Sequence, residues 1–280
     1  MKIARLVALS GVIALALVSG CSAGAGAKGE GTAQAEKVSV RTETVTYTVD
    51  GKTYRGVLAY SPDFKGKRPG VLVCHEWWGN NAYSQGRAVQ LATIGYVAFA
   101  LDMYGDGVTT TKPDEAGKLA GGVYGDLASM RRRAAGGLDV LVRSGKVDAS
   151  RVAAIGYCFG GSVALELARS GAELDAVVCF HTSNLTAKDG ADNGKIKAEV
   201  LVCNGAADPM APKAKVDEAV NALSAAGVKA TVMHYDGAVH AFTNPEADGF
   251  NIPGVKYDAV ADKHSWDAMR ALFARTIDGK

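Results

Sequence analysis

Six strand-like runs with helical stretches between them constrain the fold of this chain more than any other feature of its sequence. The runs are GVLVCHEWW, YVAFALD, RVAAIGYC, LDAVVCFHT, AEVLVCNGAAD and KATVMHYDG. Apolar runs of this kind are typical of strands buried on both faces, and their alternation with helices favours parallel pairing. The sequence therefore predicts an α/β fold with a mostly parallel central sheet and helices on both faces.

The segments around these runs complete the expected order of elements. Polar and apolar residues alternate on both sides of Asp50-Gly51, which predicts a β-hairpin ahead of the parallel strands. Residues 103–117 are polar and rich in glycine, and we expect an irregular loop there. Helical patterns are predicted at 84–95, 126–145, 162–171, 211–227 and 257–277.

The N-terminal segment has the pattern of a secretory signal. Residues 1–20 carry Lys2 and Arg5, then an apolar stretch, then small residues, and the stretch is too short for a stable membrane span. The sequence Val-Ser-Gly-Cys that ends at Cys21 resembles a bacterial lipoprotein box. That resemblance implies cleavage before Cys21 and lipidation of its thiol.

The rest of the chain is predicted to form a tether and one domain. Residues 21–37 begin with the lipidated cysteine and continue as a flexible Gly/Ala/Ser-rich tether, and residues 38–280 are expected to form the α/β domain. The expected location is the cell envelope, with the protein exported and anchored at Cys21. The alternative is ordinary signal cleavage, which would leave a periplasmic or secreted protein.

Charge and cysteine usage exclude some classes of function. The net charge of +2 and the lack of a long basic run disfavour nucleic-acid partners, and membrane contact is expected only through the N-terminal lipid. Cys74, Cys179 and Cys203 lie inside apolar runs, so we expect them to be buried free thiols. Cys158 is different because glycine lies near it on both sides. The sequence sets no oligomeric state.

The segment Gly156-Tyr157-Cys158-Phe159-Gly160 fits the pattern G-x-nucleophile-x-G, with cysteine as the central residue. A strand that turns directly into a helix strains its apex residue, and glycine two positions away on each side relieves the resulting clash. The helix dipole at the apex favours a thiolate. The structural alternative is a glycine-rich connection with an incidental cysteine, but the predicted strand and helix on either side favour a nucleophile.

A cysteine nucleophile needs a base, and the base needs an acid to orient it. In the chain order of α/β-hydrolases both follow the nucleophile, which makes Asp208 the acid and His240 the base. The alternative for Asp208 is a capping residue in the turn before Pro209, and for His240 a loop histidine. His181 is a rival base, but it precedes Asp208 in the chain.

Four segments of the sequence together resemble the signature regions of the dienelactone hydrolase family. They are CHEWWGNN, GYCFGG, NGAADPMAP and GAVHAFTNP, and the C-terminal helix resembles that family's last helix. The resemblance runs from about the hairpin to the C-terminus. It implies an α/β-hydrolase without cofactor or metal that cleaves esters and lactones through a Cys-Asp-His triad.

The resemblance also implies roles for particular residues. Cys158 becomes the nucleophile, His240 the base and then the acid, and Asp208 its orienting partner. Glu76 matches the family's glutamate beside the resting thiol, and the backbone N–H groups of Trp77 and Phe159 match its oxyanion hole. From their places near strand ends we also expect Tyr104, His181 and Phe242, with Trp77, to line the substrate pocket.

The sequence departs from the family where arginines hold a substrate carboxylate. Asn244 stands at one of these positions, and residues 103–117 contain no arginine for the other. A carboxylate loses much of its recognition without a bidentate partner. The expected partner is therefore a small neutral ester, lactone or thioester rather than dienelactone itself.

Two functions of other classes compete with hydrolysis. A hydrolase scaffold can serve as a non-catalytic, surface-displayed binding protein, because a fold does not fix a function; the intact set of Cys158, Asp208 and His240 argues against this. A thiol redox protein is the other alternative, and the absence of a C-x-x-C motif disfavours it.

Overall fold

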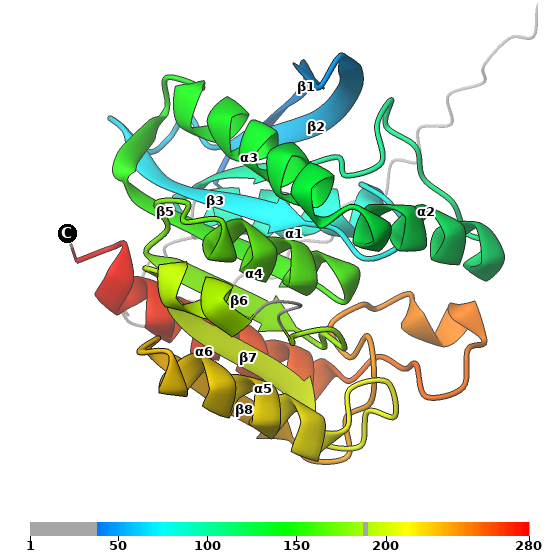
Figure 1. Cartoon of the computed structure of the whole chain (residues 1–280). Helices are drawn as coiled ribbons and strands as arrows, with labels where there is room; N and C mark the ends of the chain where they lie inside the picture. The colour runs from blue at the N-terminus through cyan, green and yellow to red at the C-terminus, as the bar shows by residue number, and fades with distance from the viewer. Residues whose placement is uncertain (1–37, 187–189, 280) are drawn as a thin grey trace, which may run out of the picture. The chain divides into compact units, whose positions relative to one another are not determined.

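Eight strands form one sheet in the order β1-β2-β4-β3-β5-β6-β7-β8 (Figure 1). The computed structural model describes residues 38–186 and 190–279. The signal peptide, the lipidated Cys21 and the tether predicted for residues 1–37 therefore lie outside the described residues. Strands β1 and β2 pair antiparallel, β2 joins β4 antiparallel, and all remaining pairs are parallel.

The described elements follow one another as expected for an α/β chain. The strands are β1 (Arg41–Val49), β2 (Lys52–Tyr60), β3 (Arg68–Cys74), β4 (Val97–Ala100), β5 (Val147–Tyr157), β6 (Ala176–Phe180), β7 (Glu199–Gly205) and β8 (Ala230–Tyr235). The helices are α1 (Ala82–Thr93), α2 (Pro113–Gly125), α3 (Leu127–Arg143), α4 (Phe159–Arg169), α5 (Lys213–Ala225) and α6 (Ala259–Thr276), with short 3₁₀ turns η1 (Gly190–Lys195) and η2 (Ala247–Phe250).

Helices cover both faces of the sheet and divide its core in two. In Figure 1, α3, α4 and α5 lie in front of the strands, and α1 and α6 lie behind them. Side chains alternate along each strand, so Leu72 of β3 packs into the cluster under α3 and α4, whereas Val71 and Val73 pack into the cluster under α1 and α6. The predicted fold class, a mostly parallel sheet with helices on both faces, is confirmed.

One element differs from the sequence-based expectation. Residues 103–117 were expected to form an irregular loop, but helix α2 begins at Pro113 inside this segment. Proline is favoured at the first helical position, and Asp114 and Glu115 complement the positive end of the helix dipole. Ala116, Ala120 and Val123 lie one turn apart and bury one face of α2.

The fold also determines the state of three thiols. Cys74, Cys179 and Cys203 are free and buried in strands β3, β6 and β7. Burial raises the pKa of Cys203 to about 12, which keeps this thiol protonated and inert. Among the helices that the structure describes, none combines the length and apolar character that crossing a bilayer requires.

Candidate active site

The turn from β5 into α4 carries Cys158 at its apex. A Cβ atom added to Gly156 would lie 2.0 Å from the carbonyl oxygen of Gly160, and one added to Gly160 would lie 2.2 Å from that of Cys74. Both distances are far below van der Waals contact. The two glycines are therefore required by close backbone approach, as the G-x-C-x-G spacing predicts.

The backbone at Cys158 has φ 53° and ψ −115°, a region that residues other than glycine rarely occupy. Its N–H donates to the carbonyl oxygen of Phe180 at 2.9 Å, and its carbonyl accepts from Gly161 N–H at 3.2 Å. These bonds hold the strained conformation between β6 and α4. As a result the thiol projects from the N-terminus of α4 and, unlike the other three described thiols, is partly exposed.

His240 and Asp208 come together from the ends of two neighbouring strands. Nδ1 of His240 lies 2.8 Å from Oδ2 of Asp208, and both side chains are buried. The other oxygen of Asp208 accepts the backbone N–H groups of Met210 at 2.7 Å and Ala211 at 3.1 Å. Asp208 thus caps the turn after β7 and contacts the imidazole at the same time, and its part in catalysis stays a prediction.

The Cys158 sulfur and the same imidazole line one cavity, and the thiol is close enough to influence the charge of the ring. Burial opposes a charge on His240, but the adjacent Cys158 and Asp208 outweigh it and raise the pKa of His240 to about 10. The ring therefore favours the imidazolium form at neutral pH. The structure places Cys158 and His240 in one cavity and pairs His240 with Asp208.

Glu76 lies in the same site, just after β3, and its side chain is buried. Its Oε2 accepts a hydrogen bond from Nδ2 of Asn244 at 2.7 Å. Burial raises the pKa of Glu76 to about 7, although Asn244, His240 and Arg87 act in the opposite direction. This carboxyl group therefore changes its charge close to neutral pH.

The two backbone N–H groups assigned to an oxyanion hole lie where the sequence expects them. Phe159 opens α4 directly after Cys158, and Trp77 follows β3 beside Glu76. In the part of the chain that the structure describes, neither N–H group makes a backbone hydrogen bond in a turn, loop or helix cap. Such donors are available to a developing negative charge.

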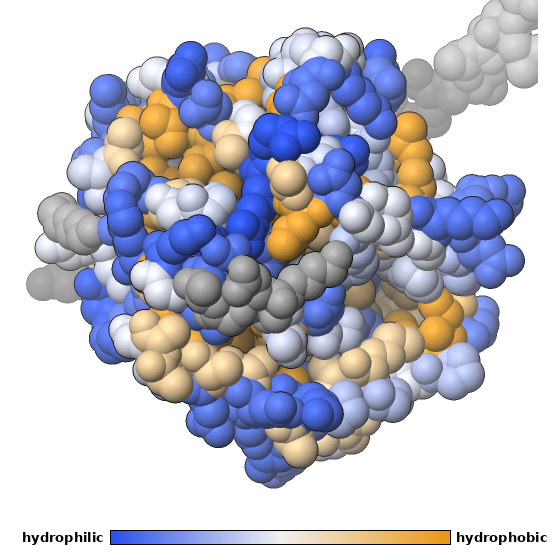
Figure 2. Space-filling model, viewed as in Figure 1, coloured by the Kyte–Doolittle hydropathy of each residue, from blue (hydrophilic) through white to orange (hydrophobic). Residues whose placement is uncertain are grey.

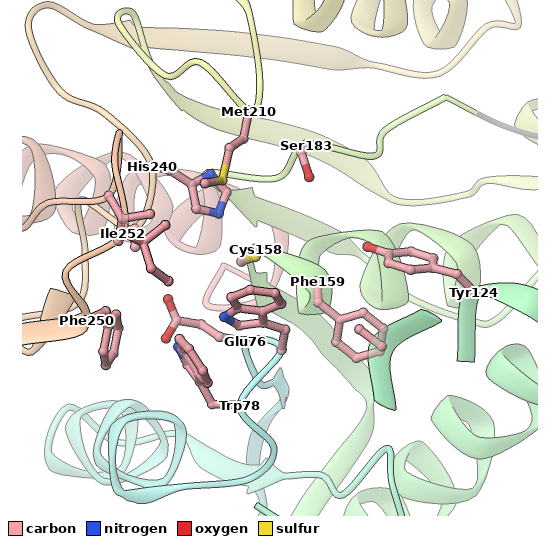
Figure 3. A pocket seen from close by; sticks show the side chains of 14 residues that line it. Glu76, Trp78, Tyr124, Cys158, Phe159, Ser183, Met210, His240, Phe250 and Ile252 are labelled. Atoms are coloured by element: carbon pink, nitrogen blue, oxygen red, sulfur yellow. The ribbon is translucent and has the colours of Figure 1, made fainter. Parts of the chain in front are cut away.

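The site opens into a cavity of about 310 Å³ with mostly apolar walls (Figure 3). In the space-filling view, apolar residues gather in a hollow between α2 and the segment that carries η2 (Figure 2). Glu76 is the carboxyl group and His240 the imidazole among the residues that line the cavity. No lysine or arginine is among them. The lining includes Glu76, Trp77, Trp78, Ala120, Tyr124, Cys158, Phe159, Ser183, Met210, His240, Ala241, Phe250, Ile252 and Val255.

Three residues expected in the pocket wall do not line the cavity, which corrects that prediction. Tyr104 is buried beneath Phe159 and donates its hydroxyl proton to the carbonyl oxygen of Trp77 at 2.8 Å. His181 is buried behind His240, with ring centroids 5.2 Å apart, and bonds to Thr243 at 2.7 Å. Phe242 is buried against His181 on the far side. These residues support the site from behind.

His181, the rival base, has no contact of its own with the acid. Its Nε2 faces the hydroxyl of Thr243, and burial together with the nearby His240 holds its pKa well below its usual range. A neutral imidazole that packs against His240 can fix the orientation of that ring, but it does not line the cavity.

Much of the cavity wall comes from residues that the sequence analysis did not select. Trp78 follows Trp77 in the chain and packs on Phe250 with ring centroids 4.8 Å apart. Ile252 and Met210 add further apolar surface, and Tyr124 reaches in from α2. The adjacent tryptophans were the one sequence feature that could have indicated this wall. The segments around η2 and α2 have no pattern that links them to the site.

Across residues 38–186 and 190–279, no group of three or more His, Cys, Asp or Glu side chains is arranged to hold a metal ion. The polar groups of the site instead pair with one another, as the contacts of Asp208 with His240 and of Asn244 with Glu76 illustrate.

Comparisons with known proteins agree on one family. Residues 55–277 match the model described as the dienelactone hydrolase family. A crystal structure described as a dienelactone hydrolase-like promiscuous phosphotriesterase from metagenomic libraries is 40% identical, with a TM-score of 0.81, and the match covers 85% of this chain and 98% of that one.

Curated relatives are more distant in sequence. "Protein usf" of Aquifex pyrophilus is 28% identical over 236 residues, which cover 82% of this chain and 97% of the relative. A putative carboxymethylenebutenolidase of Aquifex aeolicus shows the same identity and the same coverage. These matches extend over nearly the whole length of each relative, so the shared unit is the complete hydrolase domain.

Proposed function

Since the chain belongs to the dienelactone hydrolase family and is a hydrolase of esters or lactones, we propose that it cleaves small neutral substrates of this class through a Cys158–His240–Asp208 triad and an acyl-thioester intermediate. The observation that carries the proposal is the position of His240, which pairs with the Asp208 carboxylate and lines the same cavity as Cys158. That is the relation a nucleophile, a base and an orienting acid require.

In the proposed reaction His240 gives one proton to the leaving group and later takes another from water. The Cys158 thiolate attacks the ester carbonyl and forms a carbon–sulfur bond, while the imidazolium gives its proton to the departing alkoxide. The neutral imidazole then takes a proton from water, whose oxygen attacks the thioester. Release of the acid restores the thiolate and the imidazolium.

Two backbone groups support the charge that develops on the carbonyl oxygen. We assign this role to the N–H groups of Trp77 and Phe159, which flank the nucleophile. Donors of this kind contribute roughly 3 kcal/mol each to transition-state stabilisation. Because they are backbone groups held by β3 and α4, substitution of their side chains leaves the donors in place.

The cavity favours an uncharged substrate. Its walls carry aromatic and aliphatic side chains, and Glu76 would repel a second carboxylate. Arg87, whose charge acts on Glu76, pairs with Asp262 at 2.6 Å and donates to the carbonyl oxygen of Thr243. A cavity of about 310 Å³ lies at the small end of ligand pockets, which suits short acyl and aryl groups.

The test compares Cys158→Ala with Cys203→Ala on a panel of p-nitrophenyl esters, simple lactones and one neutral aryl phosphotriester. The phosphotriester is included because of the activity described for the 40% identical relative. We expect Cys158→Ala to lower kcat at least about a thousandfold and Cys203→Ala, which removes a buried thiol away from the site, to retain activity. Undiminished ester hydrolysis by Cys158→Ala contradicts the proposal.

The intermediate has its own test. Acid quenching during turnover of a slow ester, followed by peptide mass spectrometry, should find the acyl group on Cys158. Inactivity of the unmodified protein across the whole panel, with retained binding of the same compounds, favours the binding-protein alternative.

We also propose that the mature protein is lipidated at Cys21 and held at the cell envelope, as the N-terminal sequence predicts. The mass of the mature N-terminus tests this directly. A diacylated or triacylated cysteine at the first position supports the anchor, and an unmodified N-terminus produced by ordinary signal cleavage contradicts it.

A further inference from the structure

His75 is a fully buried histidine that the proposed reaction does not use. It directly follows β3 and precedes Glu76 and Trp77, and no part of its surface is exposed. A buried imidazole needs a hydrogen-bond partner for each of its ring nitrogens. Both nitrogens of His75 have one, and the two partners are of opposite kinds.

These two contacts determine which nitrogen of His75 carries the proton. The backbone N–H of Met103 donates to Nε2 at 3.2 Å, so Nε2 must be an acceptor without a hydrogen. Nδ1 lies 2.5 Å from the carbonyl oxygen of Glu76, and only a protonated Nδ1 can donate to that oxygen. Burial lowers the pKa of His75 to about 4, which keeps the ring neutral at neutral pH. His75 is therefore a neutral imidazole with its proton on Nδ1.

The carbonyl group that His75 holds belongs to the same peptide group as the N–H of Trp77. The C=O of Glu76 and the N–H of Trp77 lie in one plane and point in opposite directions, because the peptide bond between them is trans. A donor that fixes the oxygen therefore also fixes the direction of the N–H. The same oxygen accepts the N–H of Gly79 at the longer distance of 3.3 Å. The His75 bond further polarises the peptide group and makes the Trp77 N–H a stronger donor.

The His75 ring also contacts the residue that supplies the second N–H group, Phe159, which lies beside Cys158 in Figure 3. It stacks on the Phe159 ring with centroids 5.7 Å apart and planes 28° from parallel. Tyr104 packs edge-on against His75 at 5.0 Å and donates its hydroxyl proton to the carbonyl oxygen of Trp77 at 2.8 Å. One buried cluster thus holds the peptide groups on both sides of Trp77 and the side chain of Phe159.

We propose that His75 is a positioning residue for the oxyanion hole, in which its Nδ1–H holds the Glu76–Trp77 peptide group so that the Trp77 N–H keeps its direction toward the carbonyl oxygen of the ester. The proposal rests on the proposed function, because it takes the N–H groups of Trp77 and Phe159 as the oxyanion donors. His75 does not line the cavity and acts only through the peptide group. The alternative is a core histidine whose two hydrogen bonds only stabilise the fold.

Two amide variants separate the two bonds of His75. Asparagine places its NH₂ group near the position of Nδ1, so His75→Asn can keep the bond to Glu76 but loses the one to Met103. Glutamine reaches the position of Nε2, so His75→Gln can accept from Met103 but loses the bond to Glu76. We expect His75→Gln to lower kcat for p-nitrophenyl butyrate at least about tenfold with little change in KM, since removing an oxyanion donor outright costs roughly 10²- to 10³-fold. The kcat of His75→Asn should stay within about threefold of that of the unmodified protein.

Folding stability should follow the opposite order. His75→Asn leaves the buried N–H of Met103 without its acceptor, so its Tm should lie below that of His75→Gln. In His75→Gln the carbonyl oxygen of Glu76 still accepts from Gly79. A histidine that acts through stability alone would instead give activity and Tm in the same order, and that result overturns the proposal.

Methylation of Cys158 by iodomethane is the control reaction, because it involves no carbonyl oxygen and needs no oxyanion hole. Its rate in His75→Gln should stay within about twofold of that in the unmodified protein while ester turnover falls. Equal losses of both rates overturn the proposal, and so does a kcat of His75→Gln equal to that of the unmodified protein.

The tautomer has a test of its own that does not require either variant to fold. ¹⁵N NMR of the unmodified protein with labelled histidine should show, near neutral pH, a protonated Nδ1 and an unprotonated Nε2 for His75. A proton on Nε2, in the other tautomer or in an imidazolium, overturns the proposal. Failure of the proposed function is a separate result, namely full ester hydrolysis by Cys158→Ala.

Discussion

His240 and Asp208 form a buried pair, with Nδ1 of the imidazole 2.8 Å from Oδ2 of the carboxylate. The two residues follow neighbouring strands β7 and β8, and their contact is made although 31 other residues separate them in the chain. The second oxygen of Asp208 is held by two backbone N–H groups, so the carboxylate cannot turn away from the ring. This arrangement keeps the Nδ1 proton of His240 toward Asp208 in both the imidazolium and the neutral ring.

Replacing Asp208 by asparagine tests the role of this pair. The amide can retain the turn, but it no longer stabilises the imidazolium, and we expect kcat for p-nitrophenyl butyrate to fall about 10³- to 10⁴-fold with little change in KM. Steady-state kinetics provides the measurement. Asp217→Asn is the matched control, because Asp217 pairs with His234 at 2.8 Å away from the cavity, and its kcat should stay within about twofold. Equal losses in the two variants would falsify the assignment.

The raised pKa of Glu76 predicts a pH dependence of folding stability. The pKa of Glu76 is 4.5 in the unfolded chain and about 7 in the folded protein. Between these two pH values the native state therefore binds a proton that the unfolded chain does not. Its contribution is fully present below about pH 4.5 and is lost as the pH rises through about 7. Urea unfolding at pH 5 and pH 8 should therefore show a larger loss of stability for the unmodified protein than for Glu76→Gln, with a difference of about 2.5 kcal/mol. Parallel pH profiles for the two proteins would rule this out.

The glycines of α2 predict an increase in stability on substitution. A Cβ atom at Gly121 or Gly122 meets no atom within 4 Å, so alanine removes the entropic cost of glycine in a helix without any clash. Each change should stabilise the fold by about 1 kcal/mol and raise Tm by roughly 2–4 °C in a calorimetric scan.

Gly160→Ala is the informative contrast to these variants. It places a Cβ atom 2.2 Å from the carbonyl oxygen of Cys74, and this contact is with backbone that cannot yield. We expect Gly160→Ala either to fold poorly or to lose the turn between β5 and α4 that carries Cys158. A Tm for Gly160→Ala equal to that of Gly121→Ala would contradict the account of the turn.

The aromatic wall of the cavity predicts a change in binding of aryl substrates. Phe250 packs on Trp78 with ring centroids 4.8 Å apart, and both line the cavity. Phe250→Ala should raise KM for p-nitrophenyl benzoate about tenfold, because the lost stacking surface corresponds to roughly 1.4 kcal/mol of binding. We expect kcat of Phe250→Ala to change little. The KM of Phe250→Leu should lie between those of the unmodified protein and Phe250→Ala. A fall in kcat at constant KM would place Phe250 in the chemistry instead of the wall.

The sheet could be predicted from the sequence because its strands are marked by their own composition. Runs such as AVVCF and EVLVC can be buried on both faces only in the middle of a parallel sheet. Helix α2 was missed for a local reason. Gly117, Gly121, Gly122 and Gly125 weaken its helical pattern, and the apolar face formed by Ala116, Ala120 and Val123 becomes clear only when the helix is packed.

Some residues of the candidate site could likewise be predicted from the sequence, and others could not. Cys158, Asp208 and His240 could be selected because turn chemistry and chain order place them at strand ends, and Glu76 because of its resemblance to the family. The pocket wall could not, because a position at a strand end does not determine which way a side chain points. His181 and Phe242 lie at the right level but behind His240, whereas Phe250 and Ile252 reach the cavity from a segment without periodicity.

The backbone of His240 is held by residues that follow it in the chain. Its N–H donates to the carbonyl oxygen of Gly254 at 3.0 Å, and its own carbonyl accepts from Lys256 at 3.0 Å. Gly254 and Lys256 lie far after Cys158 in the chain, so the turn at Cys158 and the support of His240 come from separate parts of the sequence. A chain cut short before Gly254 would keep the residues of the Cys158 turn but lose the backbone bonds that hold the imidazole in place.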